Sequence, residues 1–168
     1  MSKKSIKLLV VDDQSIVRKG IRALLEVVPD IDVIGEASNG EEAIAQAKLL
    51  NPDVILMDLL MPKMDGIAAI REIQAGNVPK RIIALTSFVT EDKVFPAIKA
   101  GAMGYLLKDS EPEDLITAIR KVNRGEPSLH PLVAKMVLEE LSQPVKQPLT
   151  PDPLTEREVD IIRLVAQG

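Results

Sequence analysis

Three aspartates stand where apolar segments of the chain end, and they are the residues best placed for chemistry. Asp58 follows the apolar run 54–57 and precedes a loop that contains Pro62 and Gly66. Asp12 and Asp13 follow another apolar run, residues 6–11. A carboxylate carried from a buried strand into a loop can act as a nucleophile that forms a covalent intermediate.

The elements that must position these acids form a repeating pattern. Apolar runs alternate with segments of helical period, which is typical of βα units around a parallel sheet. The pattern predicts five strands, at residues 6–11, 33–37, 54–57, 82–85 and 104–107. Ile16, Gly20, Leu24 and Val28 are predicted to share one helical face, and residues 110–113 have the spacing of a capping box. We therefore expect an α/β fold, a doubly wound five-stranded parallel sheet with a C-terminal helical appendage.

The carboxyl ends of parallel strands meet at one edge of a sheet, and ligands bind there. Three carboxylates at this edge repel one another unless a cation is present. Mg²⁺ suits them, because it uses one or two carboxylates and meets phosphate oxygens directly. Thr86 and Lys108 follow the fourth and fifth strands and can contact a phosphoryl group. Taken singly, each residue has an ordinary explanation as a turn, helix cap or solvated loop, and only their joint placement favours chemistry.

Composition excludes several other classes of site. The 168 residues contain no cysteine and one histidine, so disulfides, zinc–thiolate sites and thiol catalysis are excluded, and a histidine-based triad is not expected. The formal net charge of -4 argues against a body that coats nucleic acid. No apolar stretch approaches the roughly 20 residues of a membrane span, so we expect a cytoplasmic chain without membrane contact.

The pattern changes after Gly125. A helical segment, residues 129–141, precedes the proline-rich stretch 142–153, which we interpret as an extended linker. The sequence Leu-Thr-Glu-Arg-Glu at 154–158 then starts another amphipathic helix. The expected organisation is a domain at 1–125, a linker helix and proline-rich linker at 126–153, and a helix at 154–168.

With these motifs, residues 6–124 closely resemble the receiver domain of bacterial two-component response regulators of the LuxR/NarL type. Residues 154–168 are similar to the first helix of the LuxR-type helix-turn-helix domain. The resemblance implies a flavodoxin-like sheet of order 2-1-3-4-5. It also implies a truncated DNA-binding domain, since no recognition helix follows, and we expect specific operator binding to be lost. In the full-length protein, promoter DNA would be a partner.

The resemblance also assigns roles to residues. It makes Asp58 the phosphoacceptor for a cognate sensor histidine kinase, in a chain that assists its own phosphorylation and dephosphorylation without being an enzyme. Mg²⁺ would be held by Asp12, Asp13, Asp58 and the backbone carbonyl of Leu60.

The remaining roles concern the phosphoryl group and the switch. Thr86 and Lys108 would bind the phosphoryl group, and Thr86 and Tyr105 would form the switch that leads to a homodimer on phosphorylation. Family members commonly have proline after the lysine, whereas Asp109 stands here, which leaves the geometry of that peptide bond open.

Two alternatives belong to other functional classes. The chain could be an interaction module with a receiver-like fold and no phosphoryl turnover. It could also be a phosphohydrolase with an aspartate nucleophile, but such enzymes commonly carry a second acid two residues later, where Leu60 stands. Magnesium titration with a phosphoryl analogue tests the first alternative, and turnover of a phosphomonoester tests the second.

Overall fold

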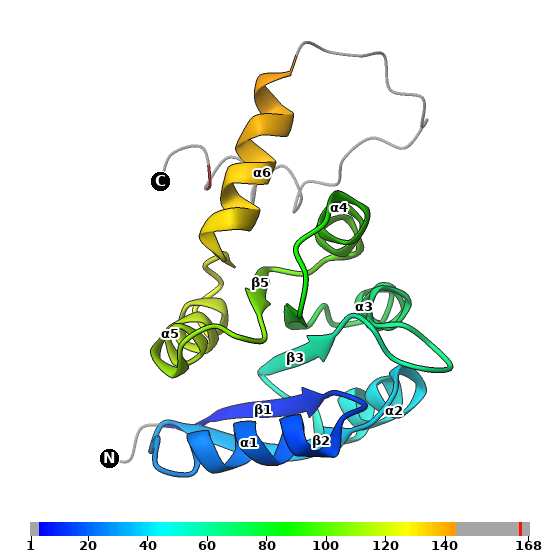
Figure 1. The fold of residues 1–168 in the computed structure, drawn as a ribbon. Helices are drawn as coiled ribbons and strands as arrows, with labels where there is room; N and C mark the ends of the chain where they lie inside the picture. Colours follow the sequence, from blue (N-terminus) through cyan, green and yellow to red (C-terminus); the bar gives the residue numbers. More distant parts are fainter. Residues whose placement is uncertain (1–3, 144–164, 166–168) are drawn as a thin grey trace.

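A parallel sheet forms the centre of the protein, seen in a computed structural model that describes residues 4–143 and Val165 (Figure 1). Within these residues the strand order is β2-β1-β3-β4-β5-β6. The strands are β1 (Ile6–Val11), β2 (Ile31–Ala37), β3 (Val54–Asp58), β4 (Arg81–Thr86), β5 (Gly104–Leu107) and β6 (Ser128–Leu129). The α/β class and the predicted order of the first five strands are confirmed.

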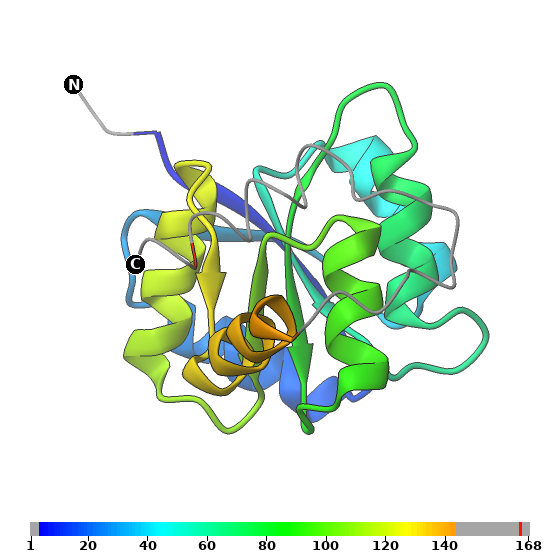
Figure 2. The same cartoon turned by 90° about the horizontal axis from the view of Figure 1, so that it is seen from above.

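Helices cover both faces of the sheet. They are α1 (Ser15–Leu25), α2 (Gly40–Leu50), α3 (Gly66–Gln74), α4 (Glu91–Ala100), α5 (Pro112–Asn123) and α6 (Pro131–Ser142). Figure 2 shows α5 on one side of the strands and α3 and α4 on the other. None of the helices within residues 4–143 combines the length and apolar character that a membrane span requires.

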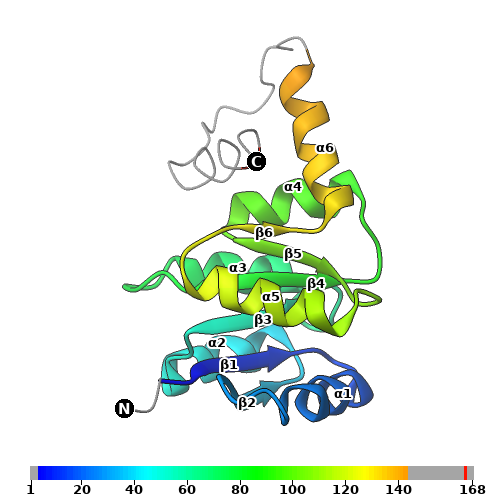
Figure 3. The same cartoon turned by 90° about the vertical axis from the view of Figure 1, so that its left-hand side faces the viewer.

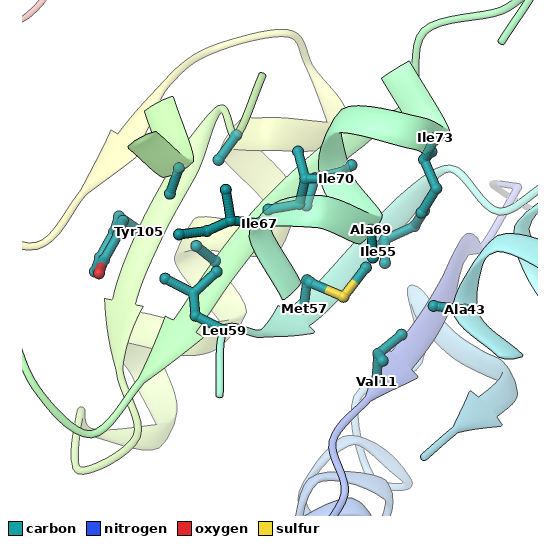
Figure 4. Packing of buried hydrophobic residues seen from close by; sticks show 14 of the residues in the cluster. Val11, Ala43, Ile55, Met57, Leu59, Ile67, Ala69, Ile70, Ile73 and Tyr105 are labelled. Carbon is teal, nitrogen blue, oxygen red and sulfur yellow. The ribbon is translucent and has the colours of Figure 1, made fainter. Parts of the chain in front are cut away.

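Two apolar clusters separate the helices into these layers. One joins the sheet to α2, α3, α4 and α6, and the other joins it to α1 and α5. Figure 4 shows part of the first cluster, with Ile55 and Met57 of β3 near Ala69 and Ile70 of α3. Every residue of β3 is buried, which explains why this strand is a continuous apolar run and not an alternating one. Only its last residue, Asp58, is polar.

The sixth strand was not predicted. Ser128 and Leu129 pair in parallel with Gly104 and Tyr105 of β5, and the amide of His130 donates to the Tyr105 carbonyl at 2.8 Å. The prediction of five strands is therefore wrong by one, because a two-residue strand has no period of its own.

The last helix within residues 4–143, α6, begins later than predicted and packs on the body. Its first residue is Pro131, which suits a first helical turn because the missing N–H has no partner there. Val133 and Val137 are buried in the same cluster as α4 and β5, and α6 stands beside both elements (Figure 3). The predicted proline-rich linker 142–153 begins too early, because Ser142 is the last residue of α6. The rest of that linker after Gln143, and the predicted helix 154–168, lie outside the described residues, apart from the helical Val165.

Two local predictions are wrong. In α1 the buried residues are Ile21 and Leu25, whereas Ile16 is 79% exposed, so the predicted face is misplaced. The N-cap of α5 is Glu111, and its side chain makes no capping hydrogen bond, so residues 110–113 do not form a capping box. Pro112 does begin that helix.

Candidate functional site

The predicted site residues at the strand ends come together at the carboxyl edge of the sheet. Asp12 directly follows β1, Asp58 ends β3, Thr86 ends β4, and Lys108 directly follows β5. Register explains the meeting, because Val11 pairs with Met57 and Thr86 pairs with Leu107. The chain therefore reaches this edge with one functional residue on each of four neighbouring strands.

The three aspartates form a compact group of carboxylates. One oxygen from each of Asp12, Asp13 and Asp58 lies within 4.8 Å of the others. Asp12 and Asp58 are buried, whereas Asp13 is exposed. Buried carboxylates at this separation repel each other strongly, so the group requires positive charge nearby.

Backbone amides orient the two buried carboxylates. The amide of Gln14 donates to Oδ1 of Asp12 at 2.8 Å, and the amide of Leu60 donates to Oδ1 of Asp58 at 3.2 Å. The second oxygen of each, Oδ2, is buried and has no hydrogen-bond donor of good geometry among the described residues. Two buried anionic oxygens are thus available to a cation.

Lys108 supplies one positive charge to these oxygens. Its Nζ lies 2.9 Å from Oδ2 of Asp12 and 3.4 Å from Oδ2 of Asp58, as ion pairs and not as well-directed hydrogen bonds. Burial lowers the pKa of Lys108, but the two carboxylates outweigh burial and raise it overall, so the ammonium stays charged. The backbone amide of Lys108 bonds the Thr86 carbonyl at 2.8 Å, which fixes the lysine to β4. The described peptide bonds are all trans, including the one before Asp109.

One ammonium does not balance two buried acids. Burial and the neighbouring Asp12 raise the pKa of Asp58 from 3.8 to about 6, although Lys108 and the Leu60 amide lower it. Near neutral pH the Asp58 carboxylate is therefore ionised but costly to keep ionised. Any further cation in the site would therefore stabilise the ionised form of Asp58.

Tyr105 and Thr86 lie on one face of the sheet but in different surroundings. Tyr105 of β5 pairs with Ala84 of β4, which stands two residues before Thr86. Side chains two residues apart in a strand point to the same face, so the Tyr105 and Thr86 side chains lie on the same face of the sheet. Its ring is fully buried, at the edge of the cluster in Figure 4. The Tyr105 hydroxyl has no partner among the described residues, and burial followed by the nearby Asp92 raises its pKa to about 12. The Thr86 side chain is also buried and accepts a 3.4 Å hydrogen bond from the Phe88 amide.

Leu60 and Gly66 shape the loop that follows Asp58. The Leu60 side chain is exposed beside the acids, whereas its amide points to Asp58. Gly66 begins α3 directly against the end of β3, and a Cβ there would lie 2.1 Å from the Asp58 carbonyl oxygen. Only glycine permits so close an approach of helix and strand.

Arg18 is a contact of the site that sequence analysis missed. It lies in α1, and its Nη1 donates to the backbone carbonyl of Asp12 at 2.5 Å. The only sequence signal is a basic pair, Arg18 and Arg22, spaced four apart on the helix that follows the acids. That signal is common on solvated helix faces.

The site combines a buried carboxylate, an adjacent ammonium, a buried hydroxyl and an acidic group able to hold a hard cation. Such a set can accept a phosphoryl group, because Asp58 offers a nucleophilic oxygen and Lys108 offers charge for the incoming oxygens. The fold and this site define a class: receiver-like α/β signalling domains.

Comparison with known proteins gives the family. The response regulator receiver domain family matches residues 8–120. LiaR, a transcriptional regulatory protein of Bacillus subtilis, is 48% identical over 163 residues, covering 97% of this chain and 77% of LiaR. The response regulator VraR of Staphylococcus aureus is 41% identical over 164 residues, with 98% and 77% coverage.

Solved structures agree. A LuxR-family two-component response regulator from Aurantimonas sp. SI85-9A1 superposes with a TM-score of 0.78 and 34% identity, covering 83% of this chain and 100% of that one. The response regulator ChrA of a heme-sensing two-component system superposes with a TM-score of 0.69 and 34% identity, and the match covers 99% of this chain and 77% of the ChrA chain. The chain belongs to the LuxR/NarL-type response regulators of two-component systems, which are regulators of transcription.

Proposed function

We propose that this chain is a phosphorylation-activated response regulator in which Asp58 accepts a phosphoryl group from a sensor histidine kinase. The observation that carries the proposal is the position of Asp58, a buried carboxylate within ion-pair distance of Lys108 and grouped with Asp12 and Asp13. Membership of the response regulators supports the kinase as the donor.

In the proposed transfer, a carboxylate oxygen of Asp58 attacks phosphorus. The bond between phosphorus and the imidazole nitrogen of the kinase phosphohistidine breaks, and its electron pair stays on that nitrogen, which takes up a proton. The product is an acyl phosphate on Asp58. Lys108 is close enough to turn from the carboxylates to the phosphoryl oxygens, and Thr86 offers its hydroxyl to another oxygen. The chain thereby assists its own phosphorylation, because the phosphoryl group ends on Asp58 of the chain itself.

The acidic group fits Mg²⁺. The two buried Oδ2 atoms share the single Lys108 ammonium, and the ligand set is made of oxygen atoms alone, as a small, hard cation requires. We assign Asp12, Asp13, Asp58 and the backbone carbonyl of Leu60 as the residues that would hold it. When bound, Mg²⁺ supplies charge neutralisation for the carboxylates and for the phosphoryl oxygens.

The proposed switch starts from the added charge. A phosphoryl group brings a charge of about -1.5 to -2 and attracts Lys108 and the Thr86 hydroxyl. Movement of Thr86 changes the space beside the Tyr105 ring on the same face of the sheet. This change biases two arrangements of α4, β5 and α5, and the favoured arrangement forms a homodimer. In a cytoplasmic protein that also carries a complete helix-turn-helix domain, the dimer would bind promoter DNA.

Phosphoryl uptake from acetyl phosphate tests the proposal. The wild-type chain should gain the mass of one phosphoryl group in a Mg²⁺-dependent reaction, as an adduct labile to acid and base. The Asp58→Asn variant should gain none. An acid-stable adduct on Asp58→Asn, or no wild-type uptake with Mg²⁺ present, contradicts the assignment. The second result would favour an interaction module without phosphoryl turnover.

A further inference from the structure

Arg18 bridges the first acidic loop and the end of a neighbouring strand. Its Nη1 donates to the Asp12 carbonyl at 2.5 Å, and its Nε lies 3.2 Å from Oε1 of Glu36 in β2. Only 18% of the Arg18 side chain is exposed, against 48% for Arg22, which pairs with the other oxygen of Glu36 at 2.9 Å. The guanidinium of Arg18 is therefore held on two sides.

The Asp12 carbonyl belongs to the peptide plane that leads into Asp13. Because a peptide is planar and leaves only two soft torsions per residue, fixing the Asp12 carbonyl restricts the direction in which the Asp13 side chain projects from the backbone. The Asp13 carboxylate is exposed and has no hydrogen bond or ion pair with any described residue. Its place in the acidic group thus depends on the backbone, which Arg18 holds.

We propose that Arg18 is a positioning residue that sets the Asp12–Asp13 peptide so that the three carboxylates converge on one cation. The inference rests on the proposed function in taking Mg²⁺ as that cation. It concerns the geometry of the loop, and Arg18 does not touch the cation or the phosphoryl group.

If Arg18 acts only through its charge, removing it should raise the affinity for Mg²⁺, whereas if Arg18 positions the loop, removing it should lower that affinity. A guanidinium beside an acidic site repels a divalent cation, so its charge alone weakens binding and its loss should tighten it. Loss of a group that orients a ligand typically weakens metal affinity by about 10- to 100-fold. Weaker binding in Arg18→Ala therefore identifies positioning.

Arg22 provides a matched control. It carries the same charge, lies one turn further along α1 and pairs with the same Glu36, but it bonds the Val33 carbonyl and not that of Asp12. Arg22→Ala removes the charge and a Glu36 contact while the Asp12 carbonyl keeps its donor. Its Mg²⁺ affinity should stay equal to that of the wild type or become tighter.

The test is a titration of the 168-residue chain with Mg²⁺, followed by backbone amide NMR. We expect Arg18→Ala to bind Mg²⁺ about tenfold more weakly than the wild type. In the metal-free state, the Asp13 and Gln14 amide signals should already be shifted in Arg18→Ala and unchanged in Arg22→Ala. Arg18→Lys, which keeps the charge but lacks the planar fork, should fall between the wild type and Arg18→Ala.

Three results overturn the inference: Arg18→Ala binding Mg²⁺ as tightly as the wild type or more tightly, both arginine variants losing affinity equally, or unmoved Asp13 and Gln14 signals. If Arg18→Ala does not fold, Arg18→Lys decides, because its unchanged charge leaves geometry as the difference. If the wild type binds Mg²⁺ and takes up a phosphoryl group, and Arg18→Ala binds Mg²⁺ with the wild-type affinity, only this inference is refuted. A wild-type chain that binds no Mg²⁺ would refute both proposals.

Discussion

Neutralising Asp58 should stabilise the metal-free protein, and the size of the gain follows from its burial. Asp58 is 2% exposed and shares one ammonium with Asp12. Asparagine keeps the oxygen that accepts from the Leu60 amide but cannot ionise. The Asp58→Asn variant therefore removes the repulsion with Asp12 while preserving this local hydrogen bond.

The magnitude comes from the displaced pKa. The rise in the pKa of Asp58 from 3.8 to about 6 corresponds to about 3 kcal/mol of stability. The sign follows from linkage: the folded pKa of Asp58 is raised, so its favourable contribution is complete below the unfolded value. That contribution is lost as pH rises from about 4 to about 6. Above this window the wild type bears the full cost of an ionised Asp58.

Urea denaturation of both proteins in a chelator, from about pH 4 to about pH 8, measures the effect. The stability of Asp58→Asn relative to the wild type should grow by up to about 3 kcal/mol across the window and then remain level. Saturating Mg²⁺ should shrink the difference, because it stabilises only the complete set of carboxylates. If the variant is no more stable than the wild type near pH 8 without Mg²⁺, the burial argument for Asp58 is wrong.

Five further substitutions test the surroundings of the site and the packing of the fold, each by urea denaturation in a chelator. Lys108→Met should destabilise the protein near neutral pH by about 3 kcal/mol, because two buried carboxylates lose their ammonium. Tyr105→Phe should leave stability unchanged or raise it by up to about 1 kcal/mol, since the lost hydroxyl is buried and unpartnered in the described chain. Val137→Ala should cost about 2 kcal/mol if α6 belongs to the core, and a cost near zero would detach it. Gly66→Ala should destabilise by more than about 3 kcal/mol, because its Cβ would meet the Asp58 carbonyl, whereas Gly20→Ala, with open space around its Cβ, should gain about 0.5–1 kcal/mol.

Periodicity predicted the strands well because each one is a local feature of the chain. The runs at 6–11 and 54–57 are buried on both faces, and such strands stand out as unbroken apolar segments. The acids at their ends could be located for the same reason. A change of residue type from apolar to acidic marks both the end of the strand and the carboxylate that the strand positions at the edge of the sheet.

The helix after the first acids shows where pattern reasoning fails. Positions 16, 20, 24 and 28 repeat every four residues, but an α-helix turns about 100° per residue, so each step drifts by about 40°. From Ile16 to Leu24 the drift reaches about 80°, and Val28 lies beyond the end of α1 at Leu25, so the four residues do not share one helical face. The structure buries Ile21 and Leu25 and leaves Ile16 exposed.

Contacts between distant segments also escape local patterns. The bond from Arg18 to the Asp12 carbonyl depends on where α1 sits against β2, and sequence spacing does not fix that placement. Burial of Tyr105 likewise depends on β6 and α6, which extend the sheet and its helical layer past β5. Their positions are set by packing and not by periodicity.

The burial that makes Asp58 unstable in the metal-free protein is also what makes it useful for the proposed chemistry. In water the three carboxylates would be screened and would bind a divalent cation weakly, whereas in the site their repulsion is relieved most by added positive charge. Lys108 supplies part of that positive charge and keeps the fold intact. The pKa of Asp58 nevertheless stays raised, so the carboxylates still lack positive charge. A site that one ammonium satisfied completely would have little to gain from a metal ion, so the incomplete neutralisation of Asp58 favours Mg²⁺ binding.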